Sequence, residues 1–265
     1  MNRSPLVSII TVVYNGERHL QQTINSVSNQ TYKPIEYLII DGASTDRTLD
    51  IIQYNETKIT LWISESDQGL YDAMNKGIKL AKGELIGMIN SDDWFEPNAV
   101  ELMVKAFLNN PTKTIFHANR YDIGLDNSKV IKKFNPSSFK FKYYGMTYHH
   151  PSMFVAKNEY KKHLYNIKLK AFSDYQFVLE AFLQTPQSFF YIDEAIVNYR
   201  LEGISAQMSF YNRLKEGFVS RREAGMFIFS NYFSLILRAV IFSYSYIKEL
   251  CLKPLKIYSK NLLKL

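Results

Sequence analysis

Two adjacent carboxylates, Asp92 and Asp93, are the residues of this 265-residue chain whose placement best suits chemistry. They follow residues 83–90, where a glycine ends a helical pattern and an apolar run predicts a buried strand. In open α/β sheets, ligands bind beyond the carboxyl ends of the strands. Two acids there can hold a hard divalent cation, which can neutralise a diphosphate. The alternative is an Asp-Asp turn that caps the helix expected at Pro97.

Two other predicted strands also end on polar residues. The nearly continuous β-branched run at residues 6–14 is typical of a parallel strand covered on both faces, and it ends at Tyr14-Asn15. A similar run at residues 35–40 ends at Asp41. Right-handed crossovers bring such strand ends to the same edge of a sheet. The sequence therefore predicts one site built from residues that are far apart along the chain.

The elements that position these residues alternate between strand and helix. Helical spacing appears at residues 17–29, after residue 46 and at 70–82, with a shorter strand at 58–64. This alternation over the first ~95 residues predicts a mostly parallel sheet of βαβ units. Further on we expect a helix at 97–110, strands at 114–123, 129–134, 149–155 and 189–199, a helix from Ser173, and helices beyond 211.

Composition limits the class of protein. Apolar residues make up 46% of the chain, so it can form a sizeable core, and the net charge of +7 is unevenly distributed. The single cysteine, Cys251, excludes an intramolecular disulfide and fits a reducing compartment. We expect no signal peptide, because Ser8 and Thr11 interrupt the first apolar run.

Four motifs together resemble the inverting family 2 glycosyltransferases. They are the opening strand that ends Val13-Tyr14-Asn15, and the segments at 41–48, at 67–83 and at 90–93. The resemblance covers residues 5–100 strongly and 145–205 weakly. It implies an α/β fold of the GT-A type, a Rossmann-like nucleotide-sugar-binding half fused to an acceptor-binding half. The implied boundaries are a catalytic domain at 1–210, divided into 1–98 and 99–210, and a helical extension at 211–265.

The resemblance also implies a donor site at the strand ends. Asp41 would accept a hydrogen bond from a base N–H, and Asp92 would hold the ribose or assist the metal. Asp93 would ligate Mg²⁺ or Mn²⁺ and bridge to the donor diphosphate. For Asp67, a contact that caps the following helix is an equal alternative. The residues implied to bind the donor are Thr11, Tyr14, Asn15, Asp41, Asp67, Asp92 and Arg200.

Inverting transfer needs a general base for the acceptor hydroxyl. Asp174 resembles the base of the family, although Ser173 stands where the family more often has an acid. The alternative is that Ser173 or Asp174 only caps the helix. His150, and less so His149, would contact a sugar or would be a structural strand end. Residues 199–205 resemble a segment that would close over the diphosphate, with Arg200 as a phosphate partner, unless Arg200 is a surface arginine beside a strand.

The C-terminal tail carries a different signal. Residues 226–247 contain one charge, Arg238, in 22 positions, a length that could span a bilayer. The central arginine and the scattered Ser and Asn argue against a span. Lysines at 248, 253, 256, 260 and 264 then alternate with apolar residues, which predicts a helix lying on a membrane surface. The alternative is a helical pair packed on the catalytic domain or on a second copy in a homodimer.

The combined prediction is a metal-dependent inverting glycosyltransferase at the cytoplasmic face of the inner membrane. It would move a sugar from a nucleotide-diphosphate-sugar, with a UDP-sugar expected, to a glycan or lipid-linked acceptor in surface polysaccharide synthesis. One rival is a sugar-phosphate nucleotidyltransferase, but Asn15-Gly16-Glu17 is not the Gly-rich basic loop of that class. The other rival is a non-catalytic nucleotide-sugar-binding module. Nucleic-acid binding is not expected, because the basic residues gather with apolar ones in the tail.

Overall fold

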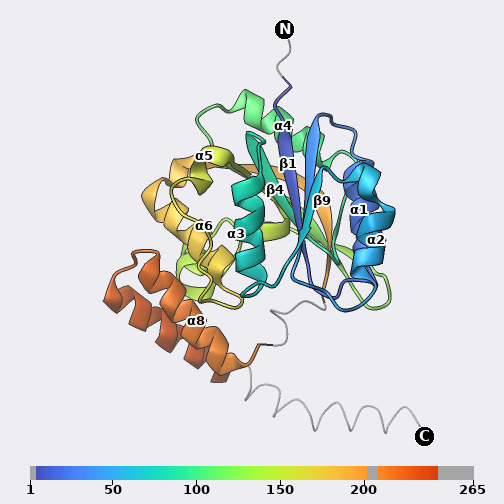
Figure 1. Cartoon of the computed structure of the whole chain (residues 1–265). Coiled ribbons are helices and arrows are strands. Elements are labelled where there is room, and N and C mark those ends of the chain that lie inside the picture. Colours follow the sequence, from blue (N-terminus) through green and yellow to red (C-terminus); the bar gives the residue numbers. More distant parts are fainter. Residues whose placement is uncertain (1–3, 202–207, 244–265) are drawn as a thin grey trace, which may run out of the picture.

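The computed structural model describes residues 4–201 and 208–243. Within those residues, a nine-stranded mixed sheet has the order β3-β2-β1-β4-β8-β6-β9-β5, and β7 pairs with β6. Helices cover both faces of the sheet (Figure 1). The strands are β1 (Val7–Val13), β2 (Ile35–Asp41), β3 (Leu61–Ser64), β4 (Leu85–Asn90), β5 (Trp94–Phe95), β6 (Ile115–Ile123), β7 (Lys129–Lys132), β8 (Met153–Ala156) and β9 (Phe189–Arg200). The helices are α1 (Leu20–Ser28), α2 (Thr48–Tyr54), α3 (Leu70–Leu80), α4 (Ala99–Asn109), α5 (Lys157–Tyr160), α6 (Ser173–Gln184), α8 (Phe210–Glu223) and a further helix at residues 228–243.

Strands β1 to β4 form the parallel part of the sheet that the sequence predicts. β1 pairs in parallel with β2 on one side and with β4 on the other, and β2 pairs in parallel with β3. Strand order therefore reverses between β1 and β4, which is where ligands bind in open α/β sheets. The polar residues that follow β1, β2 and β4 meet at this edge.

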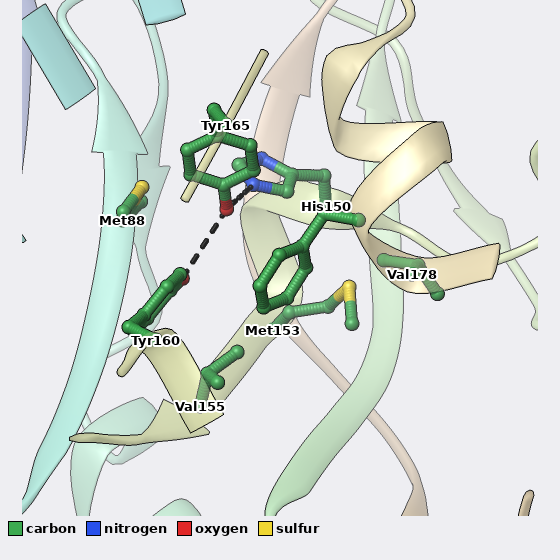
Figure 2. A pocket seen from close by; sticks show the side chains of 8 residues that line it. Met88, His150, Met153, Val155, Tyr160, Tyr165 and Val178 are labelled. Carbon is green, nitrogen blue, oxygen red and sulfur yellow. Dashed lines mark hydrogen bonds between the residues drawn. The ribbon is translucent and has the colours of Figure 1, made fainter. Parts of the chain in front are cut away.

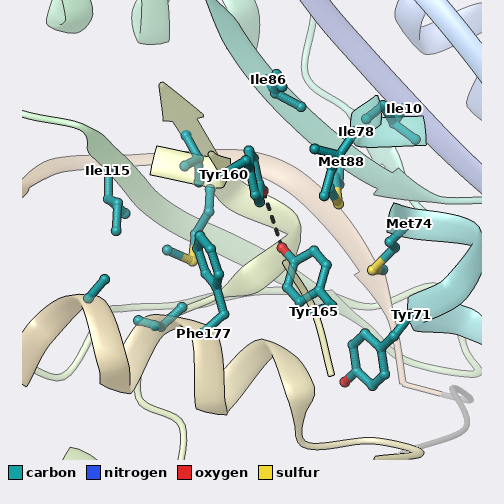
Figure 3. Packing of buried hydrophobic residues seen from close by; sticks show 14 of the residues in the cluster. Ile10, Tyr71, Met74, Ile78, Ile86, Met88, Ile115, Tyr160, Tyr165 and Phe177 are labelled. Carbon is teal, nitrogen blue, oxygen red and sulfur yellow. Dashed lines mark hydrogen bonds between the residues drawn. The ribbon is translucent and has the colours of Figure 1, made fainter. Parts of the chain in front are cut away.

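The core lies in two layers because both faces of the parallel strands are buried. On one face, α1 packs Leu20, Ile24 and Val27 against the sheet, beside α2 and α4. The other face is covered by α3 and α6, and its cluster includes Tyr71, Tyr165 and Phe177 (Figure 3). The helical spacing seen in the sequence is therefore the spacing of buried residues.

The second half of the sheet is mixed in direction. β8 runs antiparallel to both β4 and β6, while β9 runs parallel to β6 and antiparallel to β5. β8 begins only at Met153, later than the sequence predicts, because residues His150–Ser152 form a short 3₁₀ turn. Pro151 within that turn has no N–H to give to a ladder. β5 was not predicted, since two residues are too short for a periodic signal.

The C-terminal part described by the structure is helical, as expected. α8 and the helix at residues 228–243 form a pair beside α6 (Figure 1). Across the two described ranges, no helix combines the length and apolar content needed to cross a membrane. The predicted closing segment at 202–205, the end of the 226–247 stretch and the lysines from 248 onward lie outside the described residues.

Candidate active site

The loops that follow β1 and β2 are bonded to each other. The Asn15 N–H donates to Ser44 Oγ at 2.8 Å, and Asn15 Oδ1 accepts from the Thr45 N–H at 2.9 Å. Asn15 has a φ of 51°, in the left-handed region that asparagine tolerates better than most residues. Tyr14 is left 64% exposed at this edge of the sheet. The structure therefore places Tyr14 where an aromatic ring can meet a ligand, and Asn15 where it shapes the loop.

Asp41 ends β2 and is fully buried. Its carboxylate accepts from the Ser44 N–H at 3.0 Å, from Ser44 Oγ and from Ser64 Oγ at 2.6 Å. A carboxylate has about four acceptor positions, so three of them are in use. Asp41 thus connects the ends of β2 and β3 by hydrogen bonds. A base N–H would donate to the remaining acceptor position of its carboxylate, or would replace one of the serine donors.

Thr11 does not lie at this edge. Its side chain is fully buried inside β1, and its hydroxyl forms a hydrogen bond of 3.1 Å with the Tyr37 hydroxyl. Thr11 therefore lies inside the packed sheet, and its contact with the donor stays a prediction. It connects neighbouring strands because it lies two residues before the end of β1, inside the packed sheet.

Asp67 lies against the loop after β2. A Cβ added to Gly42 would come within 2.5 Å of Asp67 Oδ2, so only glycine allows this approach. Asp67 Oδ1 accepts from the N–H of Gly69 at 2.8 Å, and Gly69, at a φ of 111°, is the N-cap of α3. The helix-start contact foreseen as the alternative for Asp67 is thus present, and its other oxygen faces the strand ends.

The two acids after β4 differ in exposure. Asp93 is only 1% exposed, and its carboxylate accepts from the Arg200 N–H at 2.9 Å and the Asn90 side chain at 3.3 Å. Burial, and then the charge of Asp92, raise the pKa of Asp93 well above its usual range. Thr23 Oγ1 lies 2.9 Å from the Ser91 carbonyl and 2.6 Å from that of Asp93, and so fixes the loop to α1. Asp92 is half-buried and is the more open of the pair.

Arg200, the last residue of β9, reaches this loop from the second half of the chain. Its guanidinium donates to the Asp92 carbonyl at 2.6 Å and to Gln22 at 2.8 Å, and lies 4.4 Å from the Trp94 ring centroid. The alternative of a surface arginine that merely flanks a strand does not describe these contacts. A cation therefore stands beside the acid pair.

Asp174 lies in the first turn of α6 and is bonded to α3. The Tyr71 hydroxyl donates to Asp174 Oδ1 at 3.0 Å, and the Tyr175 N–H donates to the same oxygen at 2.8 Å. Burial, and then the Asp174 charge, raise the pKa of Tyr71 well above its usual range, so this phenol remains a donor. Phe172 is the N-cap of α6 and no side chain caps it. Asp174 nevertheless satisfies a free N–H of the first turn, as a cap does, in addition to accepting from the Tyr71 hydroxyl.

His150 belongs to a pocket next to Asp174. Its Nε2 lies 2.8 Å from the Tyr165 hydroxyl, which lies 3.2 Å from that of Tyr160 (Figure 2). Burial lowers the pKa of His150, and the charge of Asp174 opposes this effect. His149 has different charged neighbours, because burial and then the Arg120 charge lower its pKa to about 4. The two adjacent histidines therefore lie in different environments.

Sequence reasoning missed two residues of this region. Tyr71 lies inside the 67–83 motif, but nothing in the sequence indicates that it meets a residue 103 positions away. Arg120 in β6 lies with its guanidinium 4.0 Å from the Tyr199 ring centroid and 2.7 Å from Asp122, and its charge opposes the rise in the pKa of Asp93. Only the pairing of β6 with β9 brings it here.

The acid pair is the group best suited to a metal ion. Among the residues that the structure describes, no cluster of three or more His, Cys, Asp or Glu could enclose one. Carboxylate oxygens suit hard cations such as Mg²⁺, which in proteins is usually held by one or two carboxylates, substrate phosphates and water. The donor set therefore fits a divalent ion shared with a ligand, and not a closed protein cage.

The chain is similar in sequence to known glycosyltransferases. A model of "Glycosyl transferase family 2" matches residues 8–164, more than half of the chain. A hyaluronan synthase of Pasteurella multocida is 32% identical over 184 residues, which are 68% of this chain and 19% of that protein. The chain thus spans about a fifth of its length. An uncharacterized glycosyltransferase of Methanocaldococcus jannaschii is 30% identical over 74% of this chain and 71% of its own.

Solved structures resemble the whole fold. S. aureus TarS in complex with UDP-GlcNAc has a TM-score of 0.65 at 18% identity, covering 88% of this chain and 71% of that one. A mannosyltransferase from Pyrobaculum calidifontis, in complex with GDP-Man and Mn²⁺, has a TM-score of 0.63 at 14% identity over 93% and 76%. At such low identity the likeness shows the fold alone, and that fold is the expected GT-A type.

Proposed function

The chain belongs to glycosyl transferase family 2, and on this premise we propose that it transfers a sugar from a nucleoside-diphosphate sugar to an acceptor hydroxyl with inversion. The observation that carries the proposal is the hydrogen bond between Tyr71 and Asp174. Tyr71 lies in the first turn of α3, whose N-cap, Gly69, is bonded to Asp67. This bond joins the proposed base in the second half to the strand-end site in the first half.

In the proposed reaction, Asp174 takes the proton of the acceptor hydroxyl as that oxygen attacks the anomeric carbon. Its Oδ1 is fixed by Tyr71 and by the Tyr175 N–H. Asp174 is half-buried, so its other oxygen can meet an acceptor. His150, close enough for its pKa to respond to the Asp174 charge, is proposed to contact a sugar from the same side.

The acid pair is proposed to hold Mn²⁺ or Mg²⁺, with the two acids in unequal roles. Asp92, the more open acid, is proposed as the direct ligand, whereas Asp93 is held inward by Arg200 and Asn90. A bound divalent ion supplies charge neutralisation for a leaving diphosphate. Arg200 adds a second cation beside the same loop.

For the donor we propose a nucleoside-diphosphate sugar, with UDP-sugars first. Support comes from the ligands in the complexes of two structural relatives, UDP-GlcNAc for TarS and GDP-Man for the mannosyltransferase. Tyr14, exposed at the edge, and Asp41, with one acceptor position left, are the proposed contacts of the base. Asp67 is the proposed contact of the ribose or the sugar.

The proposed acceptor is a glycan or a lipid-linked glycan of surface polysaccharide synthesis. Support comes from the similarity to synthases named for hyaluronan and chondroitin. The C-terminal helices also expose apolar side chains, among them Phe227 and Phe229 at 83% and Ile236 at 62%. Such a surface suits peripheral contact with a membrane at the cytoplasmic face, where a lipid-linked acceptor would be presented.

Calorimetry of nucleotide binding tests the proposal most directly. UDP, GDP, dTDP and CMP are titrated in Mn²⁺ and in EDTA, using wild type, Asp92→Ala and Asp93→Ala. We expect one nucleoside diphosphate to bind in a metal-dependent manner, and Asp92→Ala to weaken that binding. Release of that nucleotide from its sugar conjugate in the presence of acceptor then reports transfer. A folded protein that binds none of the four overturns the proposal.

A further inference from the structure

Three side chains next to the proposed base form a continuous chain of hydrogen bonds. The Tyr160 hydroxyl lies 3.2 Å from the Tyr165 hydroxyl, which in turn lies 2.8 Å from His150 Nε2 (Figure 2). Tyr160 and Tyr165 are only 5% and 4% exposed. The pocket that these side chains line leaves no room for a water molecule. The hydrogens of both phenols must therefore be accepted within this chain.

The direction of the chain follows from counting its hydrogens. Each phenol carries one hydrogen, and a neutral imidazole has one N–H donor and one acceptor nitrogen. Within the described residues, neither hydroxyl has a further partner. If Nε2 carried the proton and donated to Tyr165, one of the two phenols would keep a buried hydrogen without an acceptor, which costs free energy. Both hydrogens are accepted only when Tyr160 donates to Tyr165 and Tyr165 donates to His150 Nε2.

His150 is consequently protonated at Nδ1. Burial lowers the pKa of His150 below its ordinary value of 6.5, although the Asp174 charge opposes this shift, so the ring is neutral at neutral pH. Nδ1 has no hydrogen-bond partner within the described residues, and the side chain is half-buried, so this N–H can meet a ligand. In contrast, Nδ1 of His117 and Nε2 of His149 are fully enclosed.

Tyr165 is itself fixed by α3, the helix that also carries Tyr71. The Asn75 side chain donates to the Tyr165 carbonyl at 2.8 Å and accepts from the Tyr165 N–H at 2.9 Å. The ring centroids of Tyr165 and Tyr71 are 5.6 Å apart (Figure 3), and the Tyr71 hydroxyl donates to Asp174. One helix therefore orients both the proposed base and the partner of the histidine.

We propose that Tyr165 is a positioning residue, which holds neutral His150 in the tautomer whose Nδ1–H donates to an oxygen of the acceptor sugar beside Asp174. The inference rests on the proposed function and deepens it, because it assigns His150 the role of a hydrogen-bond donor to the acceptor. Both ring nitrogens are then engaged, Nε2 as acceptor from Tyr165 and Nδ1 as donor to the sugar. His150 thus has no free lone pair for the proton of the acceptor hydroxyl, and that proton goes to Asp174.

Nitrogen NMR of the full chain labelled with ¹⁵N-histidine reads the tautomer without any activity measurement. The chain has five histidines, and His150→Gln identifies the signals of this ring. At neutral pH we expect Nδ1 to have the chemical shift of a protonated nitrogen and Nε2 that of an unprotonated one. Tyr165→Phe, which removes only the hydroxyl, should give a mixture of tautomers. A proton on Nε2 in the wild-type ring overturns the inference, whether or not the variants fold.

Kinetics separates positioning from packing. Release of the nucleoside diphosphate is measured over a range of acceptor concentrations. We expect Tyr165→Phe to lower kcat/KM for the acceptor by about 2- to 10-fold, the loss of one neutral hydrogen bond, with nucleotide binding unchanged. Tyr32→Phe is the matched control, because its hydroxyl donates to the Pro5 carbonyl at 2.7 Å and its ring packs in the cluster on the other face of the sheet.

Substitutions of His150 distinguish its two nitrogens. The side-chain amide of asparagine places an N–H near the position of Nδ1, whereas that of glutamine reaches the position of Nε2. We therefore expect His150→Asn to retain more of kcat/KM for the acceptor than His150→Gln, and the reverse order overturns the inference. Normal nucleotide binding with a proton on Nε2 overturns this inference alone. A folded chain that binds no nucleotide overturns the proposed function, and this inference with it.

Discussion

Replacing Tyr71 with phenylalanine removes one oxygen atom and leaves the packing of α3 in place. That oxygen donates to Asp174 Oδ1 at 3.0 Å, and the high pKa of the phenol keeps it a donor at any working pH. A hydrogen bond to a charged group contributes about 1.5–3 kcal/mol, which corresponds to about 10- to 100-fold in rate if the bond matters only in the transition state. Asp174 keeps the Tyr175 N–H, so we expect the lower end, about a 10-fold fall in kcat.

The assay is release of the nucleoside diphosphate at saturating donor and acceptor, with the nucleotide identified by calorimetry. Tyr160→Phe is the matched control, because it removes a buried phenol of the same cluster that bonds to Tyr165 and not to Asp174. We expect Tyr160→Phe to retain the wild-type kcat and both variants to bind nucleotide normally. Asp174→Asn should abolish transfer while leaving nucleotide binding intact. A kcat for Tyr71→Phe within twofold of wild type would refute the positioning role, and near-normal turnover in Asp174→Asn would remove Asp174 as the base.

Three further predictions concern the metal, the packing and the pH. In Mn²⁺ titrations followed by calorimetry with the nucleotide present, Asp92→Ala should weaken metal-dependent binding by at least about 10-fold. Asp93→Ala should instead lower the melting temperature, because its hydrogen-bond partner on β9 loses its acceptor. A loss of metal binding only in Asp93→Ala, with a lower melting temperature only in Asp92→Ala, would contradict the assigned roles. Gly83→Ala should lower the free energy of unfolding in urea by about 1–3 kcal/mol or more, because its Cβ would lie 2.5 Å from the Ser8 backbone nitrogen; an unchanged urea midpoint would show that the backbone can yield. His117 and His149 have pKa values lowered to about 3 and about 4, chiefly by burial. Below about pH 6.5 the unfolded chain therefore binds more protons than the folded chain. The stabilisation is complete above that pH, and the free energy of unfolding falls by about 2 kcal/mol per histidine at pH 5. Urea unfolding at pH 7.5 and 5.0 should show a smaller loss of this free energy in His149→Gln than in wild type.

The first half of the fold could be predicted because each signal there is local. β1, β2 and β4 are mostly apolar runs that end on polar residues, and parallel pairing alone brings those ends together. The sequence places Thr11 in the right strand, but its depth inside the sheet follows only from the packing of the neighbouring strands. The acid pair was located correctly, whereas its division into an open Asp92 and an inward Asp93 depends on Arg200.

The second half could be predicted less well because its contacts are distant in sequence. β5 exists only through its pairing with β9, and Tyr71 finds Asp174 only once α3 and α6 cover the same face. The tail was read as a surface for membranes from its composition. Arg238 was noted there as an obstacle to spanning, but its close approach to Gly217 of α8 follows from helix packing that composition does not contain.

The strand order has a consequence for synthesis on the ribosome. β9 reaches the sheet last, yet its final residue gives Asp93 the N–H that its buried carboxylate accepts. While the chain emerges at about 5–20 residues per second, the acid pair waits for roughly a further hundred residues, several seconds, before its environment is complete. A nascent chain released before residue 189 would expose the edge of β6 that β9 covers. The site is thus completed late in synthesis, after β9 has emerged. A chain that terminates earlier keeps an uncovered edge on β6 and has an incomplete site.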